Sequence, residues 1–129
     1  MDIVQRPNED GMIASELAIL MPALLLLLML AVQFGLWAHA SQLARAAADE
    51  AAYTAALPGT TIETGQAAAA GLLAQAGHLT DIRIDIDRTP DTVVATVAGV
   101  APQVVPGFRW SVSATAAAAP ERFIPQGER

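Results

Sequence analysis

Two residue types are missing altogether from this sequence of 129 residues, which has no cysteine and no lysine. Without cysteine, the chain can form neither a disulfide framework nor a thiolate metal site. Aromatic residues make up only 5% of the chain, although hydrophobic residues make up 53%. Much of the apolar content is alanine and leucine, which favour helix. The formal net charge is −6, so the chain lacks the basic surface that nucleic acid requires.

One long apolar run stands out, from Leu17 to Ala38, with no charged residue and a single strongly polar side chain, Gln33. As a helix this run spans roughly 33 Å, enough to cross a hydrocarbon core of about 30 Å. Trp37 lies near its C-terminal end, where an indole suits the headgroup region. Pro22 removes one helix hydrogen bond, so a mild kink is expected there. The run therefore predicts one transmembrane helix in a lipid bilayer.

Two other interpretations of the apolar run are weaker. A buried core helix is seldom so long and so uniformly apolar in a small chain. A cleaved secretory signal has a basic start and an apolar core of about 7–15 residues. Here the residues before the run carry one arginine and four acidic residues, although Ala38-His39-Ala40 imitates a cleavage site. Charge does not orient the helix, because Arg6 and Arg45 balance each other across it.

The segment just before the apolar run, from Gly11 to Glu16, carries the pattern with functional content. A charged side chain at mid-bilayer costs about 2.5–3.5 kcal/mol, and less near the interface, so Glu16 needs a partner. Cleavage between Gly11 and Met12 would create an α-amine four residues before Glu16, one helical turn away. Amine and carboxylate could then neutralise each other, within one chain or between staggered neighbours. Alternatively, Glu16 is only a first-turn acid, favoured by the helix dipole by about 0.3–1 kcal/mol.

A short polar leader that ends in glycine, followed by glutamate as the fifth residue and an apolar helix, is similar to the signal of type IV pilins and pseudopilins. The longer stretch resembles the TadE-like proteins of the tight-adherence (Flp-type) pilus. Their pattern is matched here at Gly11, Glu16, Ala18, Pro22, Leu24, Leu25, Gln33, Phe34 and Gly35. The leader, Met1–Asp10, departs from the usual basic prepilin leader in being acidic.

This resemblance implies a pseudopilin or minor pilin, a structural or assembly component of a tight-adherence pilus or secretion system. Its partners would be prepilin peptidase, other pilin-like subunits and inner-membrane assembly proteins. Gly11 and Met12 would flank the processing site, Glu16 would act in assembly, and the part after about Ala40 would be extracytoplasmic. The alternative is a plain single-span anchor that displays a small extracytoplasmic binding module and is not cleaved after Gly11.

Beyond the apolar run the composition still favours helix, so we expect one rod over residues 12–57, roughly 70 Å long. Pro58-Gly59 would end it. Spacings of three and four residues predict its packing stripe at Leu43, Ala46, Ala47, Glu50, Tyr53 and Leu57. The predicted organisation is a leader at 1–11, this helix, a small α+β module at 58–119 and a flexible tail at 120–129.

The predicted module has a short helix and three antiparallel strands. Thr60-Thr61 are capping candidates for a helix over Ile62–Ala76, with Gly77 at its C-cap. Alternating apolar and polar residues predict strands over 82–87 and 108–115, and a β-rich run predicts a third over 92–100. We expect Ile84 and Trp110 to be buried between the sheet and the short helix.

No pattern in the sequence indicates an enzyme, a metal site or a cofactor site. The acidic residues of the strand region have no loop with EF-hand spacing, and aspartate is usually exposed, so they are assigned to a solvated face. These residues are Asp81, Asp85, Asp87 and Asp91. No Ser-His-Asp order, phosphate loop or zinc spacing is present.

Overall fold

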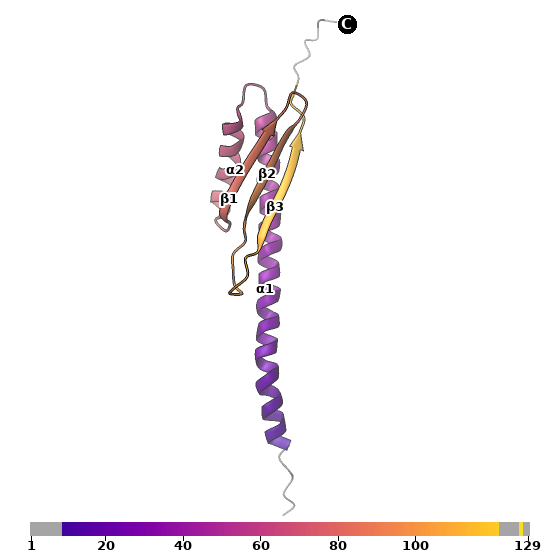
Figure 1. Ribbon diagram of the computed structural model, residues 1–129, viewed down its shortest axis with the longest axis vertical. Coiled ribbons are helices and arrows are strands. Elements are labelled where there is room, and N and C mark those ends of the chain that lie inside the picture. The colour runs from indigo at the N-terminus through magenta and orange to yellow at the C-terminus, as the bar shows by residue number, and fades with distance from the viewer. Residues whose placement is uncertain (1–8, 122–126, 128–129) are drawn as a thin grey trace, which may run out of the picture.

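The computed structural model describes residues 9–121 and 127. Its elements are α1 (Glu9–Ala56), α2 (Ile62–Ala76), β1 (Thr80–Arg88), β2 (Val93–Val100) and β3 (Ser111–Ala118). Figure 1 shows α1 as a long rod whose C-terminal half carries α2 and the sheet, while its N-terminal half stands clear of them. The predicted α+β fold class is confirmed. Residues 1–8 of the predicted leader and nearly all of the predicted tail lie outside the described residues.

Helix α1 has 48 residues, which corresponds to about 72 Å at 1.5 Å per residue. It was expected to begin at Met12, but the helix already includes Glu9 and Asp10. Two acids in a first turn interact favourably with the helix dipole, which accounts for the extension. The helix is unbroken through Pro22, and the kink expected there stays a prediction. At the other end, the Thr60 hydroxyl lies 2.7 Å from the carbonyl oxygens of both Thr54 and Leu57.

Helix α2 has the bounds and caps that the sequence predicts. The Thr61 hydroxyl accepts a hydrogen bond from the Thr64 N–H at 3.3 Å. Gly77 has the left-handed φ of 67° and donates its N–H to the Leu73 carbonyl at 3.0 Å. Its first turn holds Glu63, and hydrogen bonds from the Glu63 backbone and from Thr61 lower the pKa of that carboxyl. Local sequence chemistry therefore determines both ends of this helix.

The sheet is an antiparallel meander in the order β1-β2-β3. Ile84 pairs with Val97, and Val97 pairs on its other side with Ala114. Alternate residues of β2 are buried, starting from Val93. The third strand begins at Ser111 and not at Phe108 as expected, because residues 101–110 form a loop that is held by α1, as described below.

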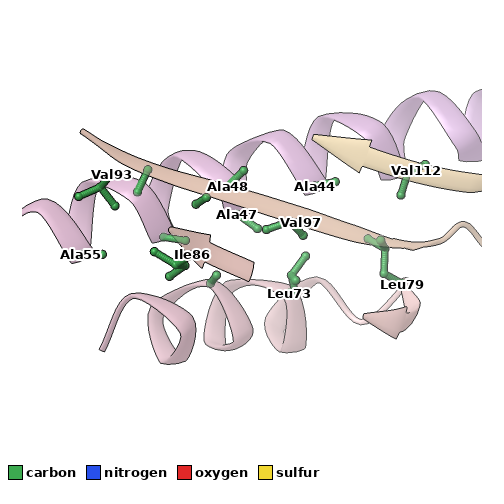
Figure 2. Packing of buried hydrophobic residues seen from close by; sticks show 14 of the residues in the cluster. Ala44, Ala47, Ala48, Ala55, Leu73, Leu79, Ile86, Val93, Val97 and Val112 are labelled. Atoms are coloured by element: carbon green, nitrogen blue, oxygen red, sulfur yellow. The ribbon is translucent and has the colours of Figure 1, made fainter. Parts of the chain in front are cut away.

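The core is built on alanine, as Figure 2 shows in part. The C-terminal half of α1 contributes eight buried alanines: Ala40, Ala44, Ala47, Ala48, Ala51, Ala52, Ala55 and Ala56. The predicted packing stripe was wrong, since Ala47 is its only fully buried member and Ala46, Glu50 and Tyr53 are exposed. Helix α1 packs against both α2 and the sheet, so its buried surface is broader than a single stripe.

The expected packing of α2 across the sheet was also wrong. Helix α1 covers β2 and β3, whereas α2 contacts α1 and β1 and, among the described residues, has no contact with β3. Ile84 and Trp110 are each only half-buried. The closest approach of the two helices is at Gly65, where an added Cβ would lie 2.8 Å from the Ala51 carbonyl oxygen. The two helices and the sheet thus share one core.

Candidate assembly and membrane sites

The N-terminal half of α1 is apolar and exposed along its length. It is the one helix in the described part of the chain that is long and apolar enough to cross a membrane. Its large side chains stay open on every side, from Met12 at 74% exposed to Phe34 at 60% exposed. A core helix would be covered by the rest of its protein, so this exposure argues against that alternative. A helix that is apolar all round suits a lipid environment.

The predicted processing and assembly residues lie together on the first turns of α1. Gly11, Met12 and Glu16 are all exposed, and the helix passes through the Gly11–Met12 bond without interruption. The Ser15 hydroxyl donates to the Met12 carbonyl at 2.9 Å. Met12 and Glu16 are four residues apart in this helix, so their side chains point to the same face. Within the described residues, no hydrogen bond or ion pair to the Glu16 carboxylate is formed, which leaves it available to a partner.

Gln33 forms a second site, which the sequence does not predict. Although it lies within the apolar run, its side chain is fully buried. Its Nε2 donates to the Pro102 carbonyl at 2.9 Å. Its Oε1 accepts from the Val104 N–H at 2.7 Å and from the Val105 N–H at 3.2 Å. One side chain of α1 therefore holds three backbone groups of the loop between β2 and β3.

A tryptophan one turn further along supports the same attachment. The Trp37 indole N–H donates to the Ser111 carbonyl at 3.2 Å, where β3 begins. The ring of Trp37 also lies 5.7 Å from the ring of Phe34, centroid to centroid, at a tilted angle. The module is thus joined to the helix at the level where the apolar run ends. The only hint of this in the sequence was a lone amide in an apolar run.

The acidic residues of the strand region do not gather into a site. Asp81 forms an ion pair with Arg109 at 2.5 Å, and both side chains are more than two-thirds exposed. Asp85 and Asp87 lie exposed on β1. In the part of the chain that the structure describes, no group of three or more potential metal ligands is present.

One apolar N-terminal helix that continues into the core of a small α+β module fits a single-pass membrane protein. The family model of TadE-like proteins matches residues 11–52. The match confirms the resemblance over the span and most of the alanine-rich half of α1. No curated protein and no solved structure matches the chain.

Proposed function

We propose that the chain is a TadE-like pseudopilin or minor pilin, a structural or assembly component of a tight-adherence pilus or secretion system. The observation that carries the proposal is the placement of Glu16. It is the only charged residue between Asp10 and Arg45, it is the fifth residue after Gly11, and it lies on an exposed helix that is otherwise apolar. The TadE-like match begins at this glycine.

In this proposal the N-terminal half of α1 packs among the apolar helices of other pilin-like subunits. Cleavage after Gly11 by prepilin peptidase leaves an amine on Met12, which neutralises a Glu16 carboxylate of the same or a neighbouring subunit. Only one stagger of neighbouring helices satisfies both charges, so the pair selects the register of assembly. The leader would face the cytoplasm and the α+β module the extracytoplasmic side.

The test compares Glu16→Leu with its parent in cells that carry the pilus machinery. Leucine removes a costly charge, so the amount of protein in the membrane should stay the same or rise. Leaving one member of a desolvated charge pair alone costs about 3–5 kcal/mol. Crosslinks to neighbouring subunits should therefore fall on the order of a hundredfold or more. Ser15→Ala is the matched control, because it changes the same turn without removing the carboxylate.

Gly11→Arg tests the processing step. A side chain at the cut site should obstruct the peptidase, so the intact mass should keep the residues before Met12, whereas the parent should lack them. Uncleaved parent protein, or crosslinks of Glu16→Leu that equal those of the parent, would refute the proposal. That result would favour the plain anchor, in which Glu16 is only a first-turn acid.

A further inference from the structure

The loop between β2 and β3, residues 101–110, is the part of the module that reaches furthest along α1 toward its N-terminus, as Figure 1 shows. No residue from Ala101 to Phe108 is charged. Several of its side chains are apolar and open to the surroundings, with Val104 40% exposed and Phe108 65% exposed. In water, two large exposed apolar side chains on one short loop would be an unfavourable arrangement.

The position of Gln33 along α1 sets the level of this loop. Gln33 is 17 residues after Glu16, about 26 Å along the helix. If the hydrocarbon core of about 30 Å begins at Glu16, Gln33 lies about 4 Å inside its far boundary. Moving the bilayer toward the module would place Gln33 deeper, and moving it the other way would expose apolar surface of the span. With the bilayer placed in this way, the loop segment that Gln33 binds lies at the edge of the bilayer.

Several polar backbone groups of the loop are hydrogen-bonded within the protein, which favours contact with lipid. Irregular backbone is tolerated at membrane depth only where its polar groups are satisfied within the protein. Gln33 satisfies the N–H groups of Val104 and Val105 and the carbonyl of Pro102. The Gln103 amide donates to the Phe108 carbonyl, and the Ala101 N–H donates to the Trp110 carbonyl at 2.9 Å. Six polar backbone groups of the loop thus have partners without water.

Polar groups resume immediately beyond the loop. Arg109, which pairs with Asp81, follows Phe108 directly, and Ser111 then begins the exposed polar face of β3. The Trp37 indole lies at this same boundary through its bond to Ser111. Aromatic and arginine side chains are the residues that favour the headgroup layer. The apolar loop tip is thus followed by the Trp37 indole and then by the charge of Arg109. Polarity increases in the same order from the hydrocarbon core of a bilayer to its surface.

We propose that the loop of residues 101–110 inserts Val104 and Phe108 into the interfacial layer of the bilayer, as a second membrane contact beside α1. The occupant of this surface is lipid, because the loop lies at the level of a helix that is itself surrounded by exposed apolar side chains. This contact fixes the module against the membrane surface. It requires neither cleavage after Gly11 nor any pilus subunit.

The test uses the full chain, which has no cysteine and so accepts single labels. Phe108→Cys, Val104→Cys, Leu27→Cys and Ala117→Cys are each given a nitroxide and reconstituted into phosphatidylcholine vesicles. Leu27 is 66% exposed within the span and Ala117 is exposed at the far end of β3, so these two variants mark lipid and water. Val104→Cys keeps the Phe108 ring in place, in case its loss alone releases the loop.

The measurement is the ratio of collisions with oxygen, which concentrates in lipid, to collisions with a water-soluble nickel chelate. We expect at least one loop position to give a ratio several-fold above that of Ala117 and closer to that of Leu27. Loop ratios equal to that of Ala117 would overturn the proposal by placing the loop in water. Shielding from both reagents that increases with the protein-to-lipid ratio would also overturn it, because a second copy would then cover the loop. Vesicles hold no pilus machinery, so neither result bears on the proposed function.

Discussion

Replacing Gln33 with leucine should release the loop of residues 101–110 from α1. Leucine is close in size to glutamine and suits the membrane, so insertion of the helix should not suffer. The buried Val105 N–H would lose its partner, at a cost of about 1–3 kcal/mol. The part-buried Val104 N–H and Pro102 carbonyl would lose theirs at about 0.5–1.5 kcal/mol each. The docked loop should therefore be destabilised by about 2–6 kcal/mol.

Amide hydrogen exchange in detergent micelles measures this loss directly. Each 1.4 kcal/mol is a factor of about ten, so protection of the Val104 and Val105 amides should fall at least about 30-fold. Amides of β2 should change much less, because the alanine core holds that strand independently of the loop. Val32→Leu, in the same turn and 48% exposed, is the control. Unchanged protection of Val104 and Val105 in Gln33→Leu would refute the assignment of Gln33 as the residue that holds the loop.

Two further predictions concern the shared core. Gly65→Ala should lower stability by about 1–3 kcal/mol through overpacking, because its Cβ would lie within 3 Å of Ala51 and Ala55 atoms. The Cβ of Gly71→Ala would meet no described atom within 4 Å, so this variant should instead raise the stability by up to about 1 kcal/mol. A melting temperature of Gly65→Ala that equals or exceeds that of Gly71→Ala would contradict this packing. A fragment of residues 59–129 lacks the alanine face of α1 and should show no cooperative melt by circular dichroism, whereas residues 39–129 should fold. A cooperative melt of the shorter fragment would mean that the module does not need α1.

The features that could be predicted from the sequence are those determined by neighbours in the chain. The C-cap of α2 at Gly77 was correct to the residue, and its N-cap, Thr61, is one of the two predicted candidates, because each cap makes its bonds within one turn. The span could be predicted from length and composition alone. Alternation located the first strand, and a β-rich run located the second. Alternation placed the start of the third strand wrongly at Phe108, which belongs to a loop held by a helix some 70 residues earlier in the chain.

The packing face of α1 could not be predicted for a different reason. Between His39 and Leu57 alanine recurs at almost every position around the helix, so hydrophobic periodicity carries little information there. The predicted stripe included larger side chains such as Leu43 and Tyr53, but Leu43 only packs against the edge of the core and Tyr53 is exposed. Gln33 was recognised as part of a family pattern, but its hydrogen bonds are long-range and left no local trace. The pairing of Glu16 with the Met12 amine stays a prediction.

The unbroken course of α1 from the span into the core has a mechanical consequence. The same backbone rod that crosses the apolar layer also carries the eight buried alanines, and no turn separates the two parts. A rotation of the membrane half about its own axis must therefore move the whole sheet around that axis by the same angle. Whatever sets the angle of the helix among its neighbours in the membrane also decides which face of the module points outward.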